Sequence, residues 1–149
     1  MTGVEIDLVV EDSLTALAFY ERVFGVETVE VTSYDKGANE AVFNLYGSRF
    51  HLLDENPEYQ LIAPKPGDNR TSWINVLVED IKSTMQKAMT ENITLIQDIV
   101  EMPEMGGANA MFVDPFGHLW LIHEMKEIVS FEDRTAYLEE KMGIEKKRP

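Results

Sequence analysis

The sequence predicts an α+β fold in which two copies of a βαβββ unit are followed by a C-terminal helix. Apolar residues recur with strand and helix periods in the order β, α, β, β, β, and the same order returns in the second half of the chain. Short motifs occupy matching places in the two halves: Val10-Glu11-Asp12 corresponds to Val78-Glu79-Asp80, and Tyr46-Gly47 corresponds to Phe116-Gly117. Such an internal repeat indicates that neither unit buries its apolar face alone, so we expect the two halves to share one core.

The first half-module covers residues 1 to about 55. Residues 4–10 alternate between an apolar face and a face that carries Glu5, Asp7 and Val9, which is typical of a half-buried strand. Asp12 or Ser13 offers an N-cap for a helix over residues 14–24, and Gly25 ends it. Three short strands are then predicted, over residues 26–32, 40–46 and 49–53.

The second half-module covers residues 72–125 and follows a linker over residues 56–71 that is rich in turn-forming residues. Its strands are predicted over 73–78, 93–100, 109–113 and 118–123, with a helix that Asp80 caps. The segment Met105-Gly106-Gly107-Ala108 is interpreted as a loop that could close over a ligand.

The last segment, residues 126–149, is predicted to carry an amphipathic helix. Ser130 with Asp133 resembles a capping box, and Gly143 marks the C-terminal stop. Its apolar stripe, made by Tyr137, Leu138 and Met142, needs a surface to cover, on this chain or on a partner.

Composition narrows the functional classes. The 149-residue chain has no Cys, which excludes disulfides, thiolate metal sites and a cysteine nucleophile. Its net charge of −14 would repel nucleic acid and anionic membranes, so we expect neither as a partner. The N-terminus lacks a basic start followed by a long apolar run, and we expect a cytoplasmic protein.

Three motifs, in this order and on a duplicated chain, carry a family resemblance. A strand ending in Val10-Glu11-Asp12 leads into the helix Ser13 to Gly25, and a late turn reads Asp114-Pro115-Phe116-Gly117-His118. Over residues 1 to about 125 the chain resembles the vicinal-oxygen-chelate superfamily of glyoxalases, bleomycin-resistance proteins and dioxygenases. The segment from Asp114 to His123, with the acidic start of the tail helix, is most similar to the PhnB-type branch.

The resemblance implies that each half-module curls into half of an open barrel-like sheet and that the concave faces enclose a cavity. In metal-using relatives, inward residues on the first and last strand of each half hold a divalent ion. Carried over, these places fall on Glu5, His51, Trp73 and Leu121. Because Trp and Leu offer no suitable ligand atom, we expect no metal cofactor. A rebuilt divalent-metal site at Glu5, His51 and His123 is the alternative.

Strand alternation adds neighbours to these inward positions. The predicted ligand cavity consists of Glu5, Asp7, His51, Trp73, Asn75, Leu121 and His123. Its candidate catalytic residues are Glu5, Asp7 and His51, since a shielded carboxylate could act as a base. A structural alternative is that these carboxylates are simply solvated or paired with Arg49.

The resulting functional hypothesis is a small-molecule-binding protein of the PhnB type that lacks the usual divalent metal. Whether it is an enzyme stays open: a lyase, isomerase or dioxygenase with a rebuilt site is one alternative, and a drug-sequestering resistance protein is another. The resemblance and the tail helix suggest a homodimer. The sequence does not identify the ligand.

Overall fold

The strands and helices follow the predicted order in the computed structural model, which describes residues 1–65 and 67–147. Pro66 of the predicted linker, and Arg148 and Pro149 of the tail, lie outside the described residues. The helices are α1 (Ser13–Phe24), α2 (Ile81–Met89) and α3 (Phe131–Met142), and two 3-10 turns are η1 (Pro57–Tyr59) and η2 (Pro103–Met105). The strands are β1 (Ile6–Val10), β2 (Glu27–Val31), β3 (Glu40–Leu45), β4 (Ser48–Asp54), β5 (Ile74–Leu77), β6 (Thr94–Met102), β7 (Gly107–Val113) and β8 (Leu119–Met125).

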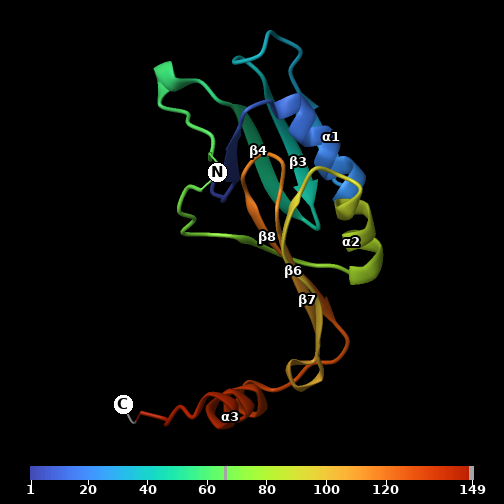
Figure 1. Cartoon of the computed structure of the whole chain (residues 1–149). Coiled ribbons are helices and arrows are strands. Elements are labelled where there is room, and N and C mark those ends of the chain that lie inside the picture. The colour runs from blue at the N-terminus through green and yellow to red at the C-terminus, as the bar shows by residue number, and fades with distance from the viewer. Residues whose placement is uncertain (66, 148–149) are drawn as a thin grey trace.

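Each half of the chain forms its own four-stranded mixed sheet, so the predicted α+β class with two βαβββ modules is confirmed (Figure 1). The strand orders are β1-β4-β3-β2 and β5-β8-β7-β6, and they correspond strand for strand. In each sheet the first strand pairs in parallel with the last strand of its module. The sheets are open and curved, and each is a separate four-stranded sheet.

Local signals set the helix ends as the sequence predicts. Asp12 is the N-cap of α1, where its Oδ1 accepts from the backbone N–H groups of Leu14 and Thr15 at 3.0 and 3.1 Å. Gly25 ends the helix in the left-handed conformation with φ of 65°, which costs glycine little. Asp80 caps α2 in the same manner, so the repeated Glu-Asp motif serves both modules as a helix start.

One core joins the two modules. Trp120 of β8 is fully buried and lies 4.8 Å from the ring of Phe24 and 5.3 Å from that of Tyr20, both on α1. Its ring also stacks on Phe50 of β4 at 6.2 Å, so the inner sides of both sheets meet at this residue. Asp114 is tied into the core because it accepts from Trp120 Nε1 at 2.8 Å and from the Tyr20 hydroxyl.

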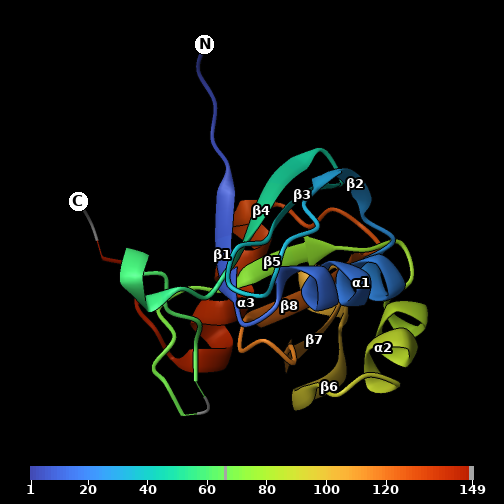
Figure 2. The same ribbon diagram turned by 90° about the horizontal axis from the view of Figure 1, so that it is seen from above.

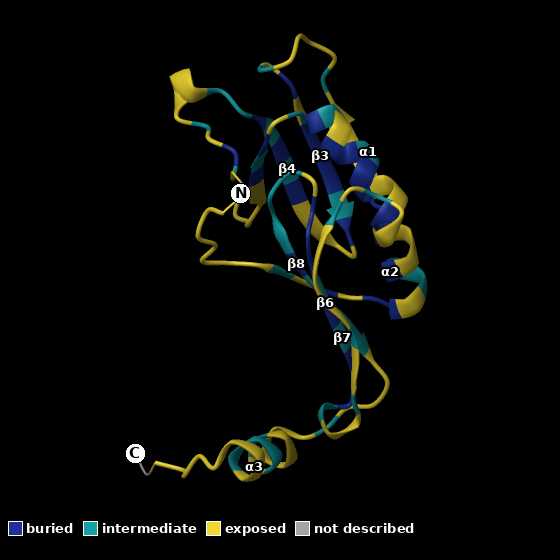
Figure 3. Ribbon diagram, viewed as in Figure 1, coloured by how far each residue is buried: buried dark blue, intermediate teal, exposed yellow. Residues whose placement is uncertain are grey.

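The opposite sides of the sheets are left open. Side chains alternate along a strand, so the neighbours of core residues point away from the shared core. On β4, Phe50 and Leu52 are buried while Arg49 is exposed, and on β5, Val76 is buried while Asn75 and Leu77 are exposed (Figure 3). These two surfaces, called here the first and second open faces, carry the predicted site residues.

Strand β7 begins two residues earlier than predicted, because Gly107 and Ala108 pair with Met125 and Glu124. A Cβ atom at Gly107 would lie 1.8 Å from the carbonyl oxygen of Glu124, so only glycine fits. The predicted glycine loop is therefore a tightly packed strand start.

Helix α3 forms where predicted, with the Ser130 hydroxyl accepting from Asp133 N–H at 3.1 Å and Gly143 at its end. None of its residues is buried, and it contacts its own chain chiefly at η2. Among the described residues, no helix has the length and hydropathy that a membrane crossing requires.

Candidate functional site

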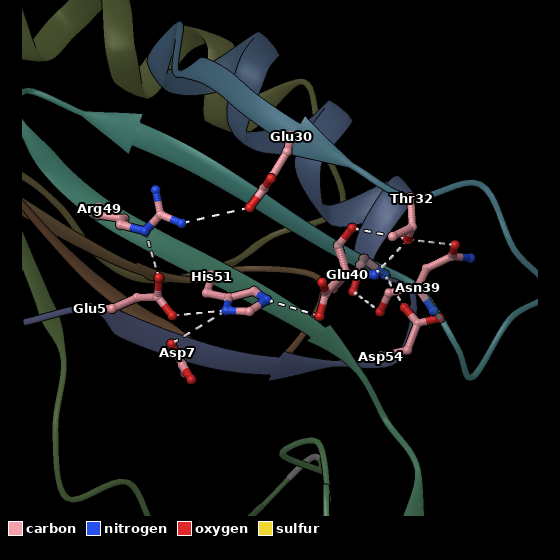
Figure 4. A network of polar contacts seen from close by, with 10 residues as sticks. Glu5, Asp7, Glu30, Thr32, Asn39, Glu40, Arg49, His51 and Asp54 are labelled. Atoms are coloured by element: carbon pink, nitrogen blue, oxygen red, sulfur yellow. Dashed lines mark hydrogen bonds and ion pairs between the residues drawn. The ribbon is translucent and has the colours of Figure 1, made fainter.

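The first open face gathers three of the predicted site residues into a polar cluster (Figure 4). Asp7 of β1 lies beside His51 of β4 in the parallel register, and Glu5 precedes β1 on the same side. Ligand-capable atoms of Glu5, Asp7 and His51 all lie within 4.8 Å of one another. Alternation along two paired strands is enough to bring them together, as the sequence predicts.

Glu5 is the centre of this cluster. Its Oε2 accepts from Arg49 Nε at 2.6 Å, and its Oε1 lies 2.8 Å from His51 Nδ1. The other ring nitrogen of His51 lies 3.3 Å from Glu40 Oε2, and its Nδ1 lies 4.0 Å from Asp7 Oδ1. The imidazole is thus held between carboxylates on both sides.

These contacts shift the protonation of the cluster. The hydrogen bond from Arg49, followed by that with His51, lowers the pKa of Glu5 from 4.5 to about 2. For Asp7, partial burial and the neighbouring Glu5 raise the pKa. Partial burial opposes a charge on His51, but the bonds to Glu5 and Glu40 outweigh it and raise the pKa of the imidazole. Both shifts favour the charged forms, a carboxylate at Glu5 and an imidazolium at His51.

The second open face carries the other four predicted residues. Asn75 of β5 lies beside Leu121 of β8, and Leu77 lies beside His123. His123 Nδ1 approaches Asn75 Oδ1 at 3.4 Å, a weak polar contact. Trp73 precedes β5 and leaves 56% of its surface exposed, and Leu77 leaves 54%. This face is a largely apolar wall with one amide and one imidazole.

The predicted residues thus form two groups on different sheets: Glu5, Asp7 and His51 on the first, and Asn75, Leu121 and His123 on the second, with Trp73 exposed just before β5. Both groups lie on the sides of the sheets that point away from the common core.

Glu40 was not among the predicted site residues, although it reaches His51. The signal was available in the hairpin of β3 and β4. Their turn at Tyr46-Gly47 sets Leu45 opposite Ser48, and this register places Val42 opposite His51 and Glu40 on the same face.

The model of the Glyoxalase/Bleomycin resistance protein/Dioxygenase superfamily matches residues 4–122, which include both modules and both open faces. The chain belongs to this superfamily. No functionally curated protein shows significant sequence similarity to it.

Solved structures of superfamily members share the fold. TioX from Micromonospora sp. ML1 is 18% identical with a TM-score of 0.63, over 84% of this chain and 99% of that one. The fosfomycin resistance protein FosX from Listeria monocytogenes, in a complex with Mn(II) and sulfate, is 16% identical with a TM-score of 0.65, over 93% and 98%. A PhnB protein from Bacillus cereus is 18% identical with a TM-score of 0.62, over 83% and 99%. At these identities the likeness concerns the fold.

Two of the four ligand places that the family resemblance implies do not fit a divalent ion, because Trp73 and Leu121 offer no ligand atom. At the other two, Glu5 accepts from Arg49 Nε at 2.6 Å and lies 2.8 Å from His51 Nδ1. An ion bound to Glu5 would have to compete with both contacts.

Proposed function

We propose that this superfamily member is a cytoplasmic, homodimeric small-molecule-binding protein of the PhnB-type branch that works without a divalent metal. The observation that carries this proposal is the bond from Arg49 to Glu5. It is joined by the side chains of Trp73 and Leu121, which stand at two of the places that the resemblance assigns to ligands and offer no ligand atom. At the places that the resemblance assigns to a ligand site, the first open face carries a charged cluster and the second carries an apolar wall.

The chemistry of the two faces fits an organic ligand. Small-molecule sites combine apolar and aromatic walls with a few placed polar groups. The second face supplies the wall through Trp73, Leu77 and Leu121, while the first supplies Glu5 and His51 as polar groups. An indole with more than half of its surface in water gains from a flat apolar ligand laid over it.

Two copies of the chain would complete the site. Within one chain the two groups of predicted residues belong to two separate four-stranded sheets. In a homodimer the charged first face of one copy could lie opposite the apolar second face of the other. A cavity between them would then contain all seven predicted residues, three from one copy and four from its partner.

A metal-dependent lyase, isomerase or dioxygenase is the second candidate, favoured by the clustering of ligand atoms from Glu5, Asp7 and His51 within 4.8 Å. His123 of the originally predicted set lies on the other sheet beside Asn75. A rebuilt site within one chain would therefore use Asp7 in its place. Sequestration of a drug is a form of the leading proposal in which no reaction follows binding.

Intrinsic tryptophan fluorescence tests the proposal directly, because the chain has two tryptophans in opposite environments. Trp73 is 56% exposed on the second face and Trp120 is fully buried in the core. The protein is titrated with a panel of planar aromatic compounds that carry positive, negative or no charge. We expect at least one of them to shift the emission of Trp73, with saturation, in the absence of added metal. The Trp73→Phe variant should bind with weaker affinity and lose the signal. If no compound binds without a divalent ion, and Mn(II) restores binding, the metal-dependent candidate replaces this proposal.

A further inference from the structure

Helix α3 has few contacts with the rest of its own chain, and none of its residues is buried. It follows β8 and projects on the side away from α1 and α2 (Figures 1 and 2). Exposed apolar side chains run from the end of β8 along this segment: Met125, Ile128, Phe131, Met142 and Ile144. Ile128 is 94% exposed and Phe131 is 68% exposed. A single helix of this length is marginal in water without a surface to pack on.

Two hydrogen bonds and a close backbone contact tie the segment between β8 and α3 to Gly106. The backbone N–H groups of Lys126 and Glu127 both donate to the Gly106 carbonyl, at 2.8 and 3.0 Å. A Cβ atom at Gly106 would lie 2.3 Å from the Glu127 carbonyl oxygen, so the segment after β8 presses on a bare backbone. The short segment from Lys126 to the N-cap Ser130 therefore holds α3 away from its own body.

The exposed area of the chain points to a protein partner of substantial size. The accessible surface is 10053 Å² for a chain of 17.0 kDa. A compact monomer of this mass exposes about 7,700 Å², so the excess is about 2,300 Å². A stable interface needs only about 800 Å² from each partner. The exposed apolar residues include Met1 and Val4 at the N-terminus and Ile128, Phe131 and Met142 around α3.

Charge argues against a lipid surface as the occupant. The first turn of α3 contains Glu132 and Asp133, and the chain as a whole carries −14. Helices that lie on anionic membranes have a basic polar face. A second copy of this chain offers open apolar faces that also need cover, and in a closed two-fold dimer each copy covers the other at equivalent places.

We propose that α3, held out by the Gly106-Gly107 junction, docks on the body of a second copy, and that two copies exchange these helices reciprocally. This inference specifies which element holds the homodimer of the proposed function. It rests on that homodimer, but a dimer that survives the loss of the α3 contacts would overturn the helix exchange alone, and ligand binding is tested separately by Trp73 fluorescence. Because both chains are acidic and the contact is apolar, added salt should strengthen the dimer by screening repulsion.

Sedimentation of the full chain tests the exchange. The wild type should have twice the 17.0 kDa chain mass at micromolar concentration. The Ile128→Ser/Phe131→Ser variant should raise the dimer dissociation constant by roughly a hundredfold, since two large apolar contacts are lost in each arm. The control Tyr34→Ser/Tyr59→Ser removes side chains that are 68% and 74% exposed elsewhere, and should leave the constant unchanged. Circular dichroism should show that both variants stay folded.

A second measurement uses the absence of cysteine from the chain. A thiol introduced by Phe131→Cys should react with a maleimide roughly tenfold more slowly in the dimer than on dilution to monomer, because docking protects it. A monomeric wild type, an equal loss of dimer in both double variants, or a dimer whose Phe131→Cys thiol reacts as fast as in the monomer would each overturn the proposal.

Discussion

The two open faces follow the same βαβββ plan, yet they carry opposite chemistry. The repeated Val-Glu-Asp motif sets Glu5 of the first module against Trp73 of the second, and Asp7 against Asn75. The strand registers set His51, beside Asp7, against Leu121, beside Asn75. At each place a charged or titratable group on the first face corresponds to an uncharged group on the second. The duplicated scaffold conserves where a side chain points, while its chemistry has separated into a charged pole and an apolar wall.

The largest expected effect is a difference in unfolding free energy between a substitution in the core and one on the second open face. Replacing the buried Trp120 by Ala should cost about 3–5 kcal/mol of unfolding free energy, because a large cavity opens between α1 and both sheets. Replacing the half-exposed Trp73 by Ala should cost less than about 1 kcal/mol but should weaken ligand binding. Urea denaturation of both variants measures the contrast. Equal costs would mean that Trp73 is an ordinary core residue and that the second face is not a binding wall.

The next effect concerns protonation on the first face. Because Glu5 stabilises the imidazolium of His51, the Glu5→Gln variant should lower the pKa of His51 toward its ordinary value. NMR titration of the His51 ring protons provides the measurement. In the control variant Glu30→Gln, the carboxylate that is removed contacts Arg49 and not the His51 ring: Glu30 Oε1 lies 3.7 Å from Arg49 Nη2. This variant should shift the pKa of His51 much less. Similar shifts in the two variants would show that long-range charge, and not the contact, sets the value.

A smaller effect is expected in the pH dependence of stability. The raised pKa of His51 means that its stabilising contribution is complete below its ordinary value of 6.5 and is lost as pH rises through the folded-state value. Because the pKa of Glu5 is lowered, its stabilising contribution is complete above pH 4.5 and is lost as pH falls toward about 2. The cluster should therefore stabilise the fold most between these limits. The His51→Gln variant should lose stability at pH 5.5 and little at pH 8, which unfolding curves at both values check.

The alternation of side chains along strands and the signals for turns and helix caps were sufficient to predict much of this structure from the sequence. They placed Glu5, Asp7 and His51 on one face of the first sheet, and Asp12, Asp80 and Ser130 at helix starts. These features depend on residues close in sequence or on adjacent paired strands, where a period of two or a cap decides the geometry.

The relative packing of the modules could not be predicted in this way. Alternation fixes which side of a sheet a residue occupies, but it does not say that Trp120 of the second sheet stacks on Phe50 of the first. His118 places its Nε2 2.8 Å from the Val9 carbonyl oxygen of the other module. The position of α3, held away from its own chain, depends on the close backbone approach at Gly106. Each of these is a tertiary contact without a local sequence signal.

Calorimetric titration of the metal-free protein with Mn(II) and Zn(II) tests the central claim, that the two faces have exchanged a metal site for an organic-ligand site. The account predicts no saturable binding to the wild type at neutral pH, because Trp73 and Leu121 supply no ligand and Arg49 occupies Glu5. The Trp73→His/Leu121→Glu variant, which restores ligand atoms at both places, should gain measurable affinity and serves as the positive control. Stoichiometric, saturable binding of either ion by the wild-type protein would contradict the account.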